Sequence, residues 1–217
     1  MPWADGIPSS WQAAKLTHKA RLGSGHTPSR NRPDLWIDCT IPWITTGEVW
    51  QIRSDEKEVI EETRECISAL GVEESSAIVH PAGTVVLCRT AASAGYSAIM
   101  GLDMATSQDF ATWTCGHELH PLFLLYCLRA MRQDLLGRLA MGSTHRTIYM
   151  PDIKSITIPL PPYWEQQEIV GSLQRTFQTL DMTRRELNVQ TQLLRERRQA
   201  LITAAVTGQL DIMKRVA

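Results

Sequence analysis

The strongest pattern in the chain lies near its C-terminus, where residues 165–207 read EQQEIVGSLQRTFQTLDMTRRELNVQTQLLRERRQALITAAVT. Leucine recurs there at every seventh position: Leu173, Leu180, Leu187, Leu194 and Leu201. Because Gly171 is the only helix breaker in the stretch, the sequence predicts one helix of roughly 60 Å, at about 1.5 Å per residue. A seam of this kind has to lie against another helix.

The seam is apolar at both ends and polar in the middle. With the leucines at heptad position d, the a positions are Val170, Phe177, Arg184, Thr191, Arg198 and Ala205. Polar residues at a weaken a coiled coil but fix its register and its partner. We therefore predict a dedicated helix pairing through the a residues from Val170 to Arg198 and the five leucines. An amphipathic helix packed on its own domain is the alternative.

Length and composition indicate a soluble globular protein. The chain has 217 residues, of which 43% are hydrophobic, enough for one domain or for one domain with an appendage. It has neither a run of 18 apolar residues nor a secretion signal, so we predict no membrane span. The cysteines form no CxxC pair, which is typical of a reduced, cytoplasmic protein, and they lie at Cys39, Cys66, Cys88, Cys115 and Cys127.

The charge of the chain is unevenly distributed. Residues 55–74 carry eight acids against two basic residues, a charge of −6, while the rest of the chain carries +5. We interpret the acidic block as a solvated helix or loop that faces away from any phosphate backbone. The remainder is then basic enough to offer DNA a modest positive face.

The order of apolar runs predicts an α+β fold with a globular domain in residues 1–160, a long helix in 161–207 and a tail in 208–217. Strands are indicated at 41–46, 84–88 and 156–160, and a helix at 122–139. The doublet Pro161-Pro162 ends the last strand and starts the long helix, because proline fits the first helical turn but not the interior. Thr207-Gly208 is a natural helix end.

Two motifs suggest enzymes, but each lacks a required group. Leu160-Pro161-Pro162-Tyr163 differs at its first residue from the Asp/Asn/Ser-Pro-Pro-Tyr motif of DNA amino-methyltransferases, and leucine cannot accept a hydrogen bond from a target amine. Gly23-Ser24-Gly25 lacks the third glycine of a dinucleotide-binding loop, and no P-loop is present. We therefore predict no catalytic residue in this chain.

A zinc site also has weak support in the sequence. Cys115, His117 and His120 lie close together, but the two histidines are three residues apart rather than four, and no fourth ligand has diagnostic spacing. The pattern favours a loop before a helix that starts at Pro121. We predict no metal and no cofactor in this chain.

Several segments, in a set order, resemble one half of a specificity subunit of a type I restriction–modification system. The opening Gly25-His26-Thr27-Pro28 is similar to the family's G-x-T-P turn, and residues 41–48 to its next strand. Residues 83–89, 94–99 and 105–108 resemble its central strands and turn. Residues 142–144 and 158–170 resemble its passage into the conserved helix, and residues 200–211 the end of that helix.

The resemblance implies a non-catalytic subunit that reads double-stranded DNA. In this family each recognition domain reads one half of a split target, and two conserved helices pair antiparallel to hold two domains apart. The subunit recruits DNA adenine methyltransferase subunits, which carry S-adenosylmethionine, and in complete systems an ATP-dependent restriction subunit. Most members carry two recognition domains and two helices, whereas this chain has a single set. We therefore expect a homodimer with antiparallel helices, which would read a palindromic split site.

Base and phosphate contacts require loop side chains that can donate hydrogen bonds. By resemblance, the candidate DNA-binding residues lie in five groups along the chain. They are Ser24, His26, Thr27, Arg30, Thr45, Thr46, Arg89, Ser93, Tyr96, Gln108, Ser143, Thr144, His145 and Arg146.

Three alternatives stay open at this point. The chain could be a coiled-coil interaction protein without a DNA role, a stand-alone enzyme, or a truncated fragment of a two-domain specificity subunit. A coiled-coil interaction protein would show no salt-dependent affinity for DNA. A stand-alone enzyme would show turnover by the isolated chain. The expected restriction–modification subunit accounts for both the domain and the helix.

Overall fold

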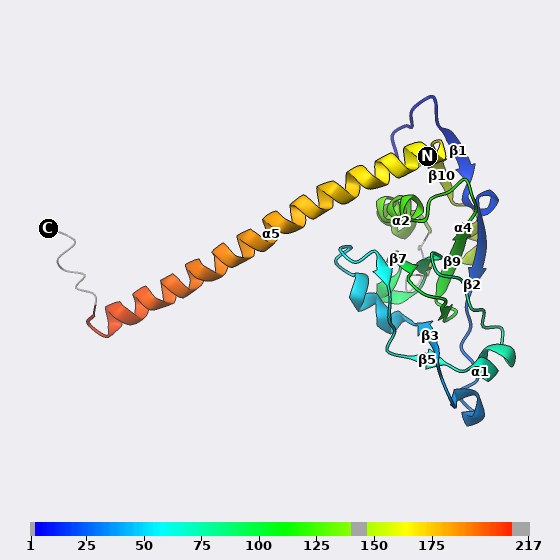
Figure 1. The fold of residues 1–217 in the computed structure, drawn as a ribbon, viewed down its shortest axis with the longest axis horizontal. Coiled ribbons are helices and arrows are strands. Elements are labelled where there is room, and N and C mark those ends of the chain that lie inside the picture. Colours follow the sequence, from blue (N-terminus) through cyan, green and yellow to red (C-terminus); the bar gives the residue numbers. More distant parts are fainter. Residues whose placement is uncertain (1–2, 140–146, 210–217) are drawn as a thin grey trace. The chain divides into compact units, whose positions relative to one another are not determined.

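The computed structural model describes residues 3–139 and 147–209, which form an α+β fold (Figure 1). The strands in this part are β1 (Gln12–Lys15), β2 (Ala20–Ser24), β3 (Ile41–Ile44), β4 (Val59–Ile60), β5 (Cys66–Ile67), β6 (Val85–Cys88), β7 (Ser97–Met100), β8 (Ala105–Thr106), β9 (Phe110–Cys115) and β10 (Thr157–Leu160). The helices are α1 (Ala69–Glu73), α2 (Pro121–Ala130), α3 (Arg132–Asp134), α4 (Met150–Lys154) and α5 (Tyr163–Val206). Short 3₁₀ turns include η3 (Thr46–Ile52) and η4 (Ala91–Ser93). The predicted α+β class is confirmed.

The strands of the described residues form three sheets. The largest has the order β2-β9-β6-β7-β4, in which all neighbours are antiparallel except β7 and β4. The second has the order β5-β3-β8, with β3 and β8 parallel. The third pairs β1 with β10, so the first and last strands of the globular part lie side by side.

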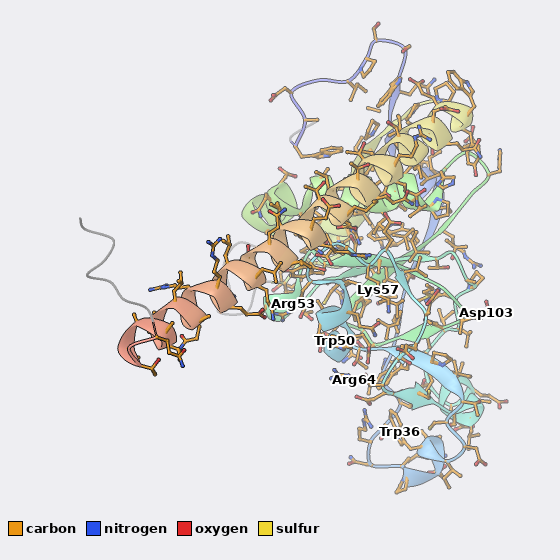
Figure 2. The ribbon with its side chains drawn as sticks, turned by 60° about the vertical axis from the view of Figure 1, so that its left-hand side comes forward. Trp36, Trp50, Arg53, Lys57, Arg64 and Asp103 are labelled. Carbon is orange, nitrogen blue, oxygen red and sulfur yellow. The ribbon has the colours of Figure 1, made fainter. Side chains whose placement is uncertain are left out.

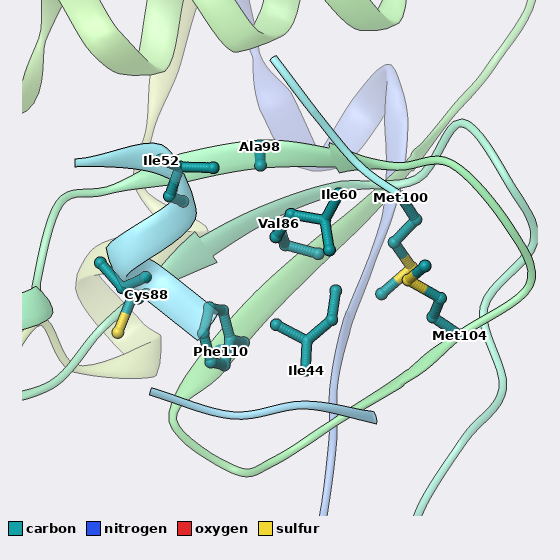
Figure 3. Close-up of a cluster of buried hydrophobic side chains, with 10 residues drawn as sticks. Ile44, Ile52, Ile60, Val86, Cys88, Ala98, Met100, Met104 and Phe110 are labelled. Atoms are coloured by element: carbon teal, nitrogen blue, oxygen red, sulfur yellow. The ribbon is translucent and has the colours of Figure 1, made fainter. Parts of the chain in front are cut away.

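The hydrophobic core lies between the largest sheet and the segments β3 and η3. Ile44, Ile52, Val86, Met104 and Phe110 belong to one cluster of buried apolar side chains (Figure 3). Helix α2 packs on β6 and β7, and Leu124, Leu125 and Leu128 of this helix are buried. Burying each large apolar side chain stabilises the fold by about 1.5–3 kcal/mol.

The helix expected at 122–139 is interrupted at Met131 rather than continuous. Helix α2 ends at Ala130, and the chain continues through α3 and a π-helical segment at Leu135–Leu139. The break places both Arg129 and Arg132 against Asp55, with Arg132 bound to both carboxylate oxygens at 2.6 and 2.7 Å. A bidentate arginine–carboxylate contact is among the strongest polar contacts, and it favours the broken helix over the regular one.

The long C-terminal helix is confirmed. It starts directly after Pro161-Pro162, and Gly208 follows it with φ = +72°, the left-handed conformation of a helix C-terminus. The chain divides into two compact units between Ile169 and Val170, so α5 begins in the globular unit. Gln166 fixes this beginning, because its buried amide donates to the carbonyls of Glu118 and Pro161 and accepts from the His120 backbone N–H. Beyond Gln209 the predicted tail lies outside the described residues.

In the described ranges, no helix has the length and apolarity needed to cross a bilayer.

Candidate nucleic-acid interface

The predicted DNA-binding loops gather at one end of the largest sheet. Strand β2 ends where β9 begins, since Ser24 pairs with Ala111, and β6 ends beside the same point, since Cys88 pairs with Phe110. Strand β7 begins next to the end of β6, where Leu87 pairs with Ser97. The loops after β2, between β6 and β7 and before β9 are therefore neighbours. They carry Ser24, His26, Thr27, Arg89, Ser93, Tyr96 and Gln108.

The loop after β2 is held against the end of β8 by a close backbone approach. The His26 backbone N–H donates to the Thr106 carbonyl at 3.0 Å, and a Cβ atom at Gly25 would lie 1.8 Å from that carbonyl oxygen. Glycine is therefore required at position 25. Just beyond it, the Thr27 hydroxyl donates to the side-chain oxygen of Gln108 at 2.7 Å, which joins two predicted DNA-binding residues.

Thr45 and Thr46 lie next to this group. The Ser107 backbone N–H donates to the Ile44 carbonyl, which places the end of β3 beside the loop that carries Gln108. Thr45 caps η3, because its hydroxyl accepts from the Gly47 N–H at 3.3 Å. Thr46 is exposed, so its hydroxyl can contact a ligand.

Arg89 lies inside this group, bound to two backbone carbonyls. One guanidinium nitrogen donates to Gln108 at 2.5 Å and another to Ile148 at 3.3 Å. The side chain thus positions both neighbouring segments. Thr90 pairs with Thr147 beside it, just after the predicted residues Ser143, Thr144, His145 and Arg146, which lie outside the described residues.

The remaining predicted residues differ in how available they are. The Ser24 hydroxyl donates to the Phe110 carbonyl, Ser93 is buried, and Tyr96 lies beneath the guanidinium of Arg132. His26 and Gln108 are exposed. Arg30 is also exposed, and it lies over the ring of Trp36 with its guanidinium carbon 3.8 Å from the ring centre.

The acidic block is only partly the solvated face predicted from the sequence. Asp55 binds Arg132, Glu65 binds Arg30 at 3.0 Å, and Glu74 binds Arg32 at 3.2 Å. Glu58 accepts a hydrogen bond from Tyr126, whose pKa is raised above its ordinary value by burial and by this carboxylate. Much of the block's charge is therefore compensated within the domain, which weakens its repulsion of a phosphate backbone.

Figure 2 labels three side chains that the sequence analysis did not select: Trp50 in η3, Arg53 directly after η3, and Arg64. Trp50 is 56% exposed, and the guanidinium carbon of Arg64 lies 4.8 Å from the centre of its ring. Because fourteen residues separate the pair in sequence, no local spacing rule could have identified it. The signal that the sequence offered was the position of Trp50, a few residues after Thr46.

The structure also describes the surroundings of the weak zinc pattern at Cys115, His117 and His120. Among residues 3–139 and 147–209, no group of three or more histidine, cysteine, aspartate or glutamate side chains is placed to hold a metal ion. Burial raises the pKa of the Cys115 thiol to about 12, so this side chain is a neutral thiol in the chain without ligands. Burial also lowers the pKa of His120.

The predicted pairing residues of α5 change in exposure along the helix. Val170 is buried and Leu173 half-buried, whereas Phe177 is 41% exposed. The next three ladder residues, Leu180, Leu187 and Leu194, are 59%, 56% and 65% exposed. Thr191, Arg198 and Leu201 are also exposed, and Arg184 lies 3.8 Å from Asp181. Apolar side chains exposed at a seven-residue interval are typical of a helix that pairs with another helix.

Comparison with known proteins identifies the family. The family model described as the type I restriction modification DNA specificity domain matches residues 8–191. The chain belongs to this family, as the resemblance in the sequence predicted.

Solved structures of the same class share the fold. A chain from a study of complex assembly and conformational transition of the type I restriction–modification system has a TM-score of 0.71 at 19% identity, covering 92% of this chain and 46% of that one. The HsdS subunit of Thermoanaerobacter tengcongensis has a TM-score of 0.64 at 22% identity, covering 97% of this chain and 48% of that one. The S subunit of M. genitalium has a TM-score of 0.53 at 16% identity, covering 83% and 42%. This chain thus spans about half the length of the chains that it matches.

Proposed function

We propose that this chain is the DNA-reading part of a type I restriction–modification complex and reads one half of a split target. The observation that carries the proposal is the convergence of the loops containing His26, Thr46 and Gln108 at one end of the sheet. Exposed hydroxyl, imidazole and amide groups can contact base edges in the major groove. The family membership supports DNA as the ligand.

The second part of the proposal concerns the helix. Two copies of α5 pair antiparallel through the leucine ladder and hold two recognition domains apart, each on its own half-site. The exposed leucines support this pairing, because a second copy would cover them. A two-fold dimer presents equivalent surfaces to the two half-sites, so the target is a split palindrome.

In the third part of the proposal, partner subunits carry out catalysis. DNA adenine methyltransferase subunits that bind S-adenosylmethionine associate with the chain and methylate the target, and an ATP-dependent restriction subunit joins complete systems. The chain itself supplies sequence recognition and spacing. The absence of an acceptor at Leu160 in the Leu-Pro-Pro-Tyr sequence supports this division of roles.

Adenine methylation across the host genome tests the proposal. Genomic DNA is sequenced for methylated bases in cells with the gene, in cells without it, and in deleted cells with the gene restored. We expect one split palindrome to lose methylation in the deleted cells and to regain it on restoration. Loss of an asymmetric split motif would instead indicate pairing with a different recognition domain, and an unchanged methylation pattern would refute the DNA-reading role.

A further inference from the structure

We infer that Trp50, Arg53 and Arg64 form a phosphate-binding patch, which we call the η3 patch. It binds phosphates of the DNA backbone beside the loops that contact the bases. The inference rests on the proposed function and extends it to residues that the family resemblance did not indicate. It concerns affinity and position on the duplex rather than base choice.

Arg53 and Arg64 are available to bind a ligand. In the described part of the globular unit, Arg30, Arg32, Arg129 and Arg132 bind carboxylates, and Arg89 binds backbone carbonyls. Arg53 and Arg64, in contrast, have no carboxylate partner among the described residues. Guanidinium groups free of internal carboxylates are available for a phosphate, which they bind with charge-assisted hydrogen bonds.

Hydrogen bonds around Glu48 hold the patch in place before any ligand binds. The carboxylate of Glu48, which is 1% exposed, accepts from the Arg64 backbone N–H at 3.0 Å and from the Gln51 amide at 2.6 Å. The same amide donates to the Glu62 carbonyl, and Lys57 donates to the Gln51 side-chain oxygen at 2.7 Å. These bonds fasten the segment before Arg64 to η3. A ligand that binds there loses little affinity to ordering the site.

Trp50 and Arg53 lie on the same face at the end of η3. Side chains three residues apart in a 3₁₀ helix lie on one side, so Arg53 follows Trp50 on the same face. The guanidinium of Arg64 lies over the ring of Trp50, and this contact restrains an otherwise flexible side chain. An exposed tryptophan alone would be unremarkable, but one flanked by two available arginines makes a cationic surface with a rigid centre.

The η3 patch adjoins the residues that are predicted to read DNA. Thr46 begins η3, so the η3 patch starts within two turns of a residue expected to read DNA. On the other side, Arg64 is followed by Glu65, which binds Arg30, another predicted DNA-binding residue. Glu61 and Glu62 are exposed just before Arg64 and limit the net positive charge of the surface. The patch is therefore sized for one or two phosphates.

The test compares charge removal inside and outside the patch. The tagged full chain is purified from its host with the subunits that remain bound to it, and its affinity for a random-sequence duplex is measured over a range of NaCl concentrations. In the double variant Arg53→Ala/Arg64→Ala, we expect the negative slope of log K against log salt to become less steep by about 1.8. Each phosphate contact contributes about 0.9 to the steepness of this slope. Trp50→Ala should reduce it by up to about 0.9, because only Arg64 loses its support.

The matched control is Arg21→Ala on β2. Arg21 is exposed, has no carboxylate partner among the described residues, and lies toward the start of its strand, whereas the recognition loops follow the strand's end. Arg21→Ala should leave the slope unchanged, although it removes one positive charge, half of what the double variant removes. Circular dichroism of each variant confirms that it is folded.

The outcomes separate the patch from the wider proposal. If the wild-type complex binds DNA and the double variant keeps its slope, the patch is refuted and the DNA-reading role stands. If the double variant instead loses a bound subunit at an unchanged slope, the surface binds protein and the patch is again refuted. If the wild-type complex has no salt-dependent affinity for DNA, both proposals fail together.

Discussion

The leucine ladder of α5 predicts how tightly two chains associate. Leu187 is 56% exposed in the single chain. Covering that fraction of a leucine, out of about 1.5–3 kcal/mol for the whole side chain, gives about 1–1.5 kcal/mol per residue. A two-fold dimer carries every substitution twice, so Leu187→Ala should cost about 2–3 kcal/mol. The dissociation constant of the dimer should therefore rise about 30- to 150-fold.

Sedimentation equilibrium over a concentration series measures this constant directly. Alanine is the best helix former, so the variant changes the seam without weakening the helix itself. The control is Val189→Ala on the same helix. Val189 is 61% exposed, but it lies two positions after the d residue Leu187, on the outer face of a paired helix. It should leave the dissociation constant within about threefold of the wild-type value, a change below 1 kcal/mol.

Two results would refute this reasoning. The wild-type chain could sediment at its monomer mass of 24.4 kDa at every concentration, which would remove the self-pairing altogether. Alternatively, Leu187→Ala and Val189→Ala could weaken association equally, which would mean that exposed apolar area rather than the heptad seam holds the chains together.

Three further predictions concern the globular unit. Glu48→Ala leaves the Arg64 N–H and the Gln51 amide without their buried acceptor, so urea unfolding should give a loss of about 2–3 kcal/mol; an unchanged midpoint would contradict the role of this carboxylate. Gly25→Ala forces a Cβ against the Thr106 carbonyl and should lower Tm by about 4 °C or more, whereas Gly6→Ala, with open space around it, should not change Tm. Burial lowers the pKa of His80, so below about pH 6.5 the unfolded chain binds a proton that the folded chain resists, and stability falls as the pH decreases. His80→Gln should flatten this decline in urea unfolding between about pH 7.5 and 5.5, and an equally steep decline would assign it to other groups.

Helix α5 and the strands β3, β6 and β10 could be predicted because their signals are local. Pro161-Pro162 and Gly208 mark the ends of α5, and the runs at 41–46, 84–88 and 156–160 contain β3, β6 and β10. The short strands β4, β5 and β8, of two residues each, were not predicted, because their pairing depends on partners distant in sequence. The break after α2 was missed for the same reason, since it depends on Asp55 more than seventy residues earlier.

The candidate DNA-binding residues could be predicted as a set of loop positions, but the internal contacts of their side chains could not. The sequence placed Arg89 among the DNA-binding residues, and the structure gives its guanidinium two carbonyl partners inside the domain. It also gives Ser24 and Ser93 internal positions. Composition identifies which side chains can donate hydrogen bonds, whereas their availability depends on neighbours that only the folded chain brings together.

The pairing of β1 with β10 has a consequence for how such a protein can change its target. Gln12 lies opposite Leu160, so the chain enters and leaves the globular unit at the same place. A domain whose two ends meet can be exchanged as one piece, since the replacement has to match the rest of the protein at a single point. New sequence preferences could therefore be acquired by transplanting residues between β1 and β10, with the long helix and its seam left as they are.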